Sequence, residues 1–158
     1  MDIIFAIKCV HLLAAAVMLG TWLCLAIFLV LAHRSGNTSV VALTAQFVVN
    51  VELTVMASAF ALELISGFPL AWAIGLSPLA EFWIVVSLFF YAAILGCWVA
   101  AVRIEMRIRG LTREAALNGV PLSSAYRQLF RKWRLLAGPI LIGMIGVYAL
   151  MVWQPRLD

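Results

Sequence analysis

CVHLLAAAVMLGTWLCLAIFLVLA, residues 9–32, contains no Asp, Glu, Lys or Arg, and this stretch decides the fold class. A helix of about 20 apolar residues crosses the roughly 30 Å hydrocarbon core of a bilayer. Lipid offers the backbone no hydrogen-bond partner, so a run of this kind forms a helix and not a strand. Three further apolar runs follow along the chain, at residues 43–65, 82–102 and 135–153. The sequence therefore predicts four transmembrane helices.

The composition is that of an integral membrane protein. Of the 158 residues, 66% are hydrophobic and only 11% are charged, whereas soluble domains carry about 25% charged residues. We expect an all-α fold, an antiparallel up-down bundle of four transmembrane helices in a single domain of residues 1–158. A cytoplasmic loop is expected between helices three and four. The predicted spans are about 5–32, 43–66, 82–105 and 135–154.

The basic residues are concentrated in one connection, and this predicts the orientation. The formal net charge is +4, and most of the 11 basic residues lie between the third and fourth runs. They are Arg103, Arg107, Arg109, Arg113, Arg127, Arg131, Lys132 and Arg134. By the positive-inside rule the 103–134 loop is cytoplasmic, so both termini are external. The charge therefore indicates orientation and contact with anionic lipid, and not nucleic-acid binding.

The connections carry recognisable helix breakers. Helix two is expected to end at residues 66–69, SGFP, because Gly and Pro interrupt helices. The next segment, 69–81, is too apolar for a solvated loop, so we expect it to lie along the outer interface or to fold back over the bundle. Helix three is expected to continue through Arg109. A break at residues 118–121, NGVP, should precede an interfacial helix at 126–134.

Two of the predicted helices place ionisable groups on one face. Polar side chains inside a span are costly, so they face the interior of the bundle. Residues three, four or seven positions apart share a face of a helix. The two faces are Lys8, His11, Ala15, Met18 and Trp22 on helix one, and Glu52, Met56, Ala59 and Glu63 on helix two.

The depth of these groups predicts which of them meet. His11 lies roughly 14 Å outward of the middle of the first run, at a rise of about 1.5 Å per residue. Helix two runs in the opposite direction, so Glu63 also lies roughly 14 Å outward. Lys8, His11 and Glu63 can therefore share one level, with Glu63 as the counter-charge of Lys8. Glu52 lies near the bilayer centre without a basic partner.

His11 is the candidate metal or haem ligand, because neutral imidazole is the commonest metal donor in proteins. A Lys–Glu–His cluster that only fixes helix packing would explain the same residues. The other histidine, His33, lies roughly 33 Å further along the same helix, so the two cannot share one haem in a single chain. At the level of His11 the facing runs offer Glu63, Ser87 and, somewhat deeper, Tyr148.

Several short motifs are spread over nearly the whole chain. They are Lys8-x-x-His11 with Leu19-Gly20, Leu31-Ala32-His33-Arg34-Ser35, Glu81-x-Trp83-Ile84-Val85-x-Ser87-Leu88, Arg131-x-Trp133, Gly138-Pro139, and Leu150-Met151-Val152-x-Gln154-Pro155. With these motifs the sequence resembles a bacterial family of four-helix integral membrane proteins that carries a domain of unknown function. That family is distantly similar to the copper-resistance CopD membrane domain and to HemJ-type protoporphyrinogen oxidases. The resemblance implies a bacterial cytoplasmic (inner) membrane protein. Through the HemJ type it also implies haem b bound by a first-helix histidine, and only His11, with Lys8 one turn earlier, matches that motif.

Three functional hypotheses follow, and none of them decides whether the protein is an enzyme. The first is a haem-b-binding or redox-associated membrane protein with His11 as axial ligand and with Lys8 and Glu63 beside it. The second is a non-enzymatic accessory or assembly subunit that packs against another membrane subunit or a second copy of itself. The third is a copper-handling protein that uses soft sulfur ligands. Those ligands would be Met18, Met56, Cys9, Cys24 and Cys97.

Overall fold

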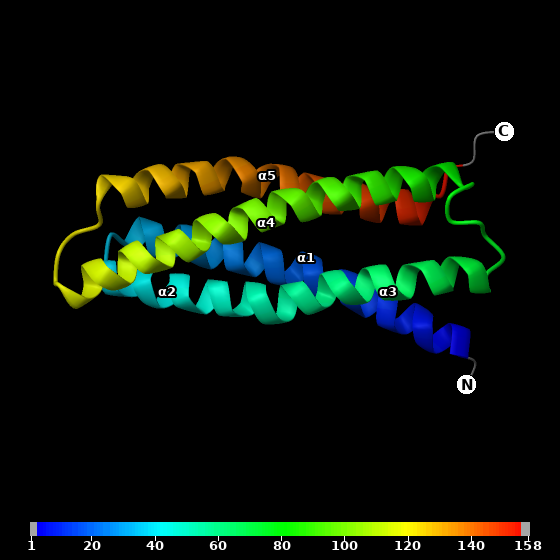
Figure 1. The fold of residues 1–158 in the computed structure, drawn as a ribbon, viewed down its shortest axis with the longest axis horizontal. Helices are drawn as coiled ribbons and strands as arrows, with labels where there is room; N and C mark the ends of the chain where they lie inside the picture. Colours follow the sequence, from blue (N-terminus) through cyan, green and yellow to red (C-terminus); the bar gives the residue numbers. More distant parts are fainter. Residues whose placement is uncertain (1–2, 156–158) are drawn as a thin grey trace.

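The computed structural model describes residues 3–155, which are helical apart from short connections (Figure 1). The elements are α1 (Ile3–Ser35), α2 (Thr38–Val51), the π-helical segment η1 (Glu52–Met56), α3 (Ala57–Ala73), α4 (Phe82–Leu117) and α5 (Ser124–Trp153). Because α2, η1 and α3 follow one another without a break, residues 3–155 form four long helices. All four are long and apolar enough to cross a membrane. The predicted all-α bundle of four transmembrane helices is confirmed.

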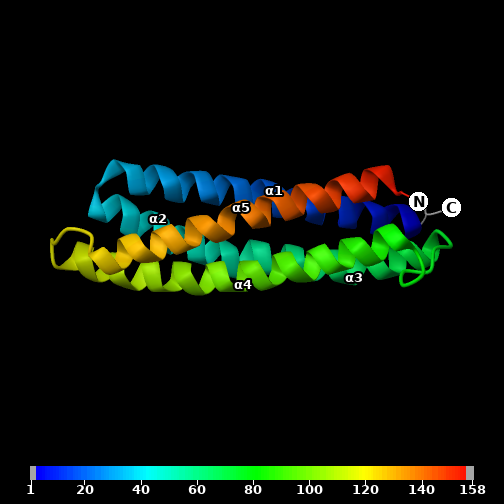
Figure 2. The ribbon, with the colours of Figure 1, turned by 90° about the horizontal axis from the view of Figure 1, so that it is seen from above.

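The four helices run antiparallel to their neighbours in sequence (Figures 1 and 2). The start of α1, the connection 74–81 and the end of α5 lie together at one end, which we call the terminal end. The turn at 36–37 and the connection 118–123 lie at the other end, which we call the basic end. The closest packing is between α4 and α5, between α2 and α4, and between α1 and α3.

The α1–α2 turn is specified by two residues. Gly36 has a φ of +67°, which a residue without a Cβ adopts at little cost. The side chain of Asn37 accepts hydrogen bonds from the backbone N–H groups of Ser39 and Val40, at 3.0 and 3.2 Å. This is an N-cap, which satisfies donors that the first turn of a helix leaves free. The chain therefore reverses within two residues.

The second long helix does not end at residues 66–69 as predicted, because α3 continues through Pro69 to Ala73. Proline removes one backbone hydrogen bond from a helix. Neighbouring helices and side-chain donors compensate for such losses in membrane helices. The added turn also buries Ala71. The prediction was therefore wrong by about one helical turn.

The 103–134 loop is also largely helical, with only residues 118–123 outside helices. The predicted continuation of helix three and the break at 118–121 are both confirmed, and α4 extends to Leu117. The reason lies in apolar side chains that recur along one face of each arm. Ile108 on α4 and Tyr126 and Phe130 on α5 belong to the same buried core as the centre of the bundle. The helical hairpin is therefore packed, although its outer surface is strongly basic.

The predicted interior faces of the first two helices are buried, with one exception. His11, Ala15, Met18 and Trp22 are buried on α1, and Glu52, Met56, Ala59 and Glu63 are buried on the second long helix. The exception is Lys8, which is exposed. Glu52 begins the π-helical segment, and π-helical turns within α-helices are frequent at functional sites.

Candidate functional site

His11 and Glu63 are in direct contact near the terminal end of the bundle. The imidazole Nδ1 lies 3.0 Å from Glu63 Oε2 and 3.0 Å from the Ser66 hydroxyl. Ser66 donates its own proton to the carbonyl of Leu62, so the hydroxyl accepts at the imidazole. We therefore assign the proton of the neutral ring to Nδ1, which leaves Nε2 with its lone pair free.

The predicted common level of His11 and Glu63 is correct, but the predicted partner of Glu63 is not. We expected Glu63 to neutralise Lys8, whereas the structure pairs Glu63 with His11. Lys8 is exposed and forms no ion pair within residues 3–155. A long lysine side chain can keep its ammonium in water while its stem follows the apolar surface. The shorter histidine stays inside the bundle.

Gly67 makes room for the imidazole on α3. A Cβ placed on this residue would lie 3.3 Å from His11 Cε1, which is tighter than nine in ten real Cβ contacts. Since Gly67 is one residue after Ser66, the same helical turn supplies both a hydrogen-bond acceptor and the space for the ring. The glycine that we had assigned to a helix break therefore serves a close approach within a continuous helix.

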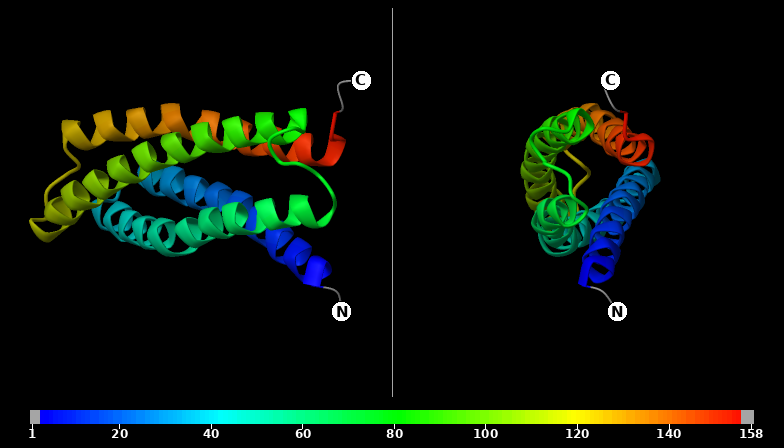
Figure 3. Two further views of the ribbon diagram at one scale, coloured as in Figure 1. Left: turned by 45° about the vertical axis from the view of Figure 1, so that its right-hand side comes forward. Right: turned by 90° about the vertical axis from the view of Figure 1, so that its right-hand side faces the viewer.

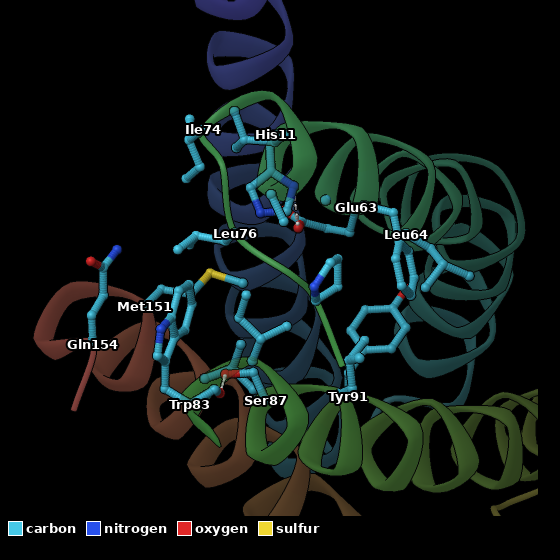
Figure 4. Close-up of a pocket in the computed structure, with 18 of the residues that line it drawn as sticks. His11, Glu63, Leu64, Ile74, Leu76, Trp83, Ser87, Tyr91, Met151 and Gln154 are labelled. Carbon is cyan, nitrogen blue, oxygen red and sulfur yellow. Dashed lines mark hydrogen bonds and ion pairs between the residues drawn. The ribbon is translucent and has the colours of Figure 1, made fainter. Parts of the chain in front are cut away.

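A cavity of about 280 Å³ adjoins His11 at the terminal end (Figure 4). His11 and Glu63 lie on one side of it, and Trp83, Ser87 and Met151 lie across from them. The lining is mainly apolar and comes from α1, α3, α4 and α5. Lys8 and Gln154 add polar groups.

The connection 74–81 covers part of this cavity. Ile74, Leu76 and Pro78 are among the lining residues, and the connection runs across the terminal end in the end-on view (Figure 3). Of the two placements that we expected for this segment, the structure has the one that folds back over the bundle. Its apolar composition is explained by this packing.

A second, smaller cavity of about 30 Å³ lies on the inner side of Glu63. Glu63 Oε1 and the Tyr148 hydroxyl are both buried without a hydrogen-bond partner, and both residues line this cavity. A volume of this size holds a water molecule when polar partners are present. Three methionines contribute to the remaining wall, which consists of Ala15, Met18, Tyr91, Ile94, Met144, Val147 and Met151.

The other candidate ligands are not brought together. Met56 and the three cysteines line neither cavity, and no group of three His, Cys, Asp or Glu residues within 3–155 could hold a metal ion. His33 lies near the basic end, where its Nδ1 is 2.9 Å from the Tyr126 hydroxyl and its ring stacks on Phe130. The predicted separation of the two histidines is therefore correct.

The sequence analysis did not predict several polar contacts in the interior of the bundle. Ser66 follows Glu63 by three positions and so shares its helical face, which is a signal that could have been used. Glu105 is buried and accepts a hydrogen bond from Trp133. In the sequence it stands between Arg103 and Arg107, which is typical of an exposed residue. Trp98 Nε1 donates to Glu52. Such contacts are hard to predict from an apolar run, because tryptophan is treated as a hydrophobic residue although its indole N–H is a hydrogen-bond donor.

Residues 5–155 match the model of DUF2269, a family described as predicted integral membrane proteins. The chain belongs to this family. The match covers nearly the whole protein, so the expected resemblance to a family of integral membrane proteins is confirmed. No curated protein and no solved structure matches the chain. The more distant similarity of this DUF2269 member to CopD and HemJ-type proteins stays a hypothesis.

Proposed function

We propose that this membrane protein binds a lipid-soluble redox cofactor in the cavity beside His11, and that the cofactor is haem b. The observation that carries the proposal is the state of the imidazole. Its Nδ1 is held by Glu63 and Ser66, while Nε2 has no hydrogen bond within residues 3–155. Metal-binding histidines commonly donate one ring N–H to a carboxylate, which fixes the tautomer and increases the basicity of the other nitrogen.

The residues around the cavity fit this group in chemistry and only partly in volume. Trp83, Tyr91 and the aliphatic side chains give the apolar and aromatic surroundings that a porphyrin face requires. The volume of about 280 Å³ is close to the lower limit of about 300 Å³ for pockets that enclose a drug-sized ligand. The cavity is only partly enclosed, so a ring larger than this volume would enter it with one edge.

Each residue has a defined role in such a site. His11 would hold the haem through its free ring nitrogen, while Glu63 and Ser66 orient the imidazole and Gly67 leaves room for it. Lys8 provides a positive charge at the cavity for an acidic substituent of the ligand. Haem b, when bound, supplies one-electron redox chemistry at its iron.

A copper-handling function is the second candidate, and the small cavity favours it. Met18, Met144 and Met151 bring three thioether side chains to its wall, and thioethers are ligands that Cu(I) prefers. This set shares only Met18 with the ligands expected from the sequence. Elemental analysis of the purified protein distinguishes the two candidates, since only the second requires copper in stoichiometric amount.

The absorption spectrum of the protein, purified from its native membrane in mild detergent, tests the haem proposal. We expect a Soret band that responds to reduction and to added imidazole, because the facing helices offer no second histidine at the level of His11. A protein that carries no haem and takes none up on reconstitution would overturn the proposal. Co-purifying membrane subunits would then favour the accessory-subunit hypothesis.

A further inference from the structure

Glu52 is a carboxyl group in the middle of the bundle with one hydrogen bond and one free oxygen. Its side chain is 0% exposed. Oε2 accepts a hydrogen bond from Trp98 Nε1 at 2.5 Å, whereas Oε1 has no partner within residues 3–155. The residue opens the π-helical segment, where the backbone departs from regular α-helical hydrogen bonding. Burial of a carboxyl at a distorted turn is costly, and packing alone gives no reason for it.

Glu105 repeats this arrangement toward the basic end. Its side chain is 2% exposed. Oε1 accepts from Trp133 Nε1 at 2.7 Å, and Oε2 has no partner within the described chain. Glu105 follows Trp98 by seven positions on the same face of α4. Glu52 on the second long helix and Glu105 on α4 belong to helices that pack against each other, and each acid has its indole partner on α4 or α5.

No basic side chain lies within ion-pair distance of either acid in residues 3–155, where the one close contact between a carboxylate and a basic group is that of Glu63 with the imidazole of His11. Arg103 and Arg107 flank Glu105 in the sequence but are exposed. Other buried or half-buried titratable side chains of the packed helices form no hydrogen bond to Glu52 or Glu105. They are Cys9, His11, Glu63, Glu81, Tyr91 and Tyr148 toward the terminal end, Cys97 beside Trp98, and His33, Arg109 and Tyr126 toward the basic end.

The surroundings select a proton over a metal cation. An isolated carboxylate in an apolar interior is strongly disfavoured, and the group takes up a proton instead. Hard cations require about six oxygen ligands, whereas each carboxyl here has an indole N–H donor as its partner. In the acid form the carbonyl oxygen keeps the tryptophan hydrogen bond, and the proton resides on the oxygen that lacks a partner.

We propose that Glu52 and Glu105 form an internal proton-binding site, in which Glu52 Oε1 and Glu105 Oε2 carry the protons and exchange them with water at the basic end. Uptake converts a carboxylate and a proton to the carboxylic acid, and release reverses this step. The site is independent of the His11 cavity, so it does not require a bound cofactor. Of the two acids Glu105 lies nearer the basic end, and its neighbours Arg103 and Arg107 are exposed.

Infrared spectroscopy of the full chain in lipid nanodiscs tests this site at neutral pH. Protonated carboxyl groups give a C=O stretching band that carboxylates and glutamine lack, and this band shifts in heavy water when the proton exchanges. We expect Glu52→Gln and Glu105→Gln each to remove part of the band. Glu114→Gln is the matched control, because Glu114 is exposed on the same helix and should leave the band unchanged.

Three outcomes would overturn the proposal: full band intensity in both variants, a band in the native chain that does not shift in heavy water, or a stoichiometric metal ion that the variants lose. Trp98→Phe keeps the inference testable if the glutamine variants do not fold. It removes the N–H donor and keeps the acid, so the band of Glu52 should move to the position of a free carboxylic acid. An unchanged spectrum in this variant also contradicts the proposal.

Discussion

The Nδ1 atom of His11 lies 3.0 Å from Oε2 of Glu63, across the contact between α1 and α3. The contact joins the first helix to the second near the terminal end and orients the imidazole of His11, which also lines the neighbouring cavity. One interaction therefore serves both the packing of the bundle and the candidate site.

Replacement of His11 by alanine should abolish haem binding. The reason is the loss of the one imidazole at the cavity, and the Soret absorbance of the purified variant measures it. His33→Ala is the matched control, because His33 lies near the basic end against Tyr126 and Phe130. A Soret band that survives in His11→Ala, or disappears only in His33→Ala, contradicts the assignment.

Glu63→Leu should destabilise the fold by about 1–3 kcal/mol, because it leaves the buried Nδ1–H of His11 with one acceptor fewer. Combination with His11→Leu should cost less than the sum of the two single changes, since residues in one hydrogen-bonded pair are energetically coupled. Denaturant titrations in detergent measure this. Lys8→Met provides the control and should be additive with Glu63→Leu, because Lys8 is exposed. Coupling of Glu63 to Lys8 instead of His11 would show that the pairing is wrong.

Alanine should stabilise the fold at one helical glycine and give no net gain at another. At Gly96 on α4 nothing lies within 4 Å of an added Cβ, so alanine should stabilise the helix by up to about 1 kcal/mol. At Gly67 the same Cβ would meet His11 Cε1 at 3.3 Å. The displaced imidazole should cancel that gain and weaken ligand binding. Melting temperatures of the two variants, measured side by side, check this. An equal gain at both positions would mean that the ring does not depend on Gly67.

The basic end should face the cytoplasm. Reporter domains inserted at Gly119, in the connection between α4 and α5, should be active only as cytoplasmic reporters. Insertions at Gly75 and fusions to the C-terminus should behave as external. The physical reason is the retention of Arg and Lys near helix ends on the cytoplasmic side. A cytoplasmic signal from the Gly75 insertion would reverse the orientation.

The helix faces were predictable from the sequence for a clear reason. A charged or polar side chain within an apolar run is unfavourable in lipid and therefore faces the interior of the bundle. Glu52 and Glu63 thus identify the inward side of their helix, even when its neighbouring helices are not known. The helical rise then places His11 and Glu63 at one level. The same reasoning did not identify Glu105 as buried, because the arginines next to it in the sequence are typical of an exposed helix. Its burial depends on Trp133, which belongs to another helix.

The sequence by itself determined the four long apolar helices and the buried faces of the first two, because lipid imposes backbone hydrogen bonding and amphipathic periodicity locally. Only the tertiary structure decided that Glu63 pairs with His11 and not with Lys8. His11 and Lys8 are on the same face of α1. Which of them contacts Glu63 depends on how α1 packs against α3. The cavity and the tryptophan partners of the buried acids were decided in the same way, since they are formed by side chains that meet only when helices distant in sequence pack together.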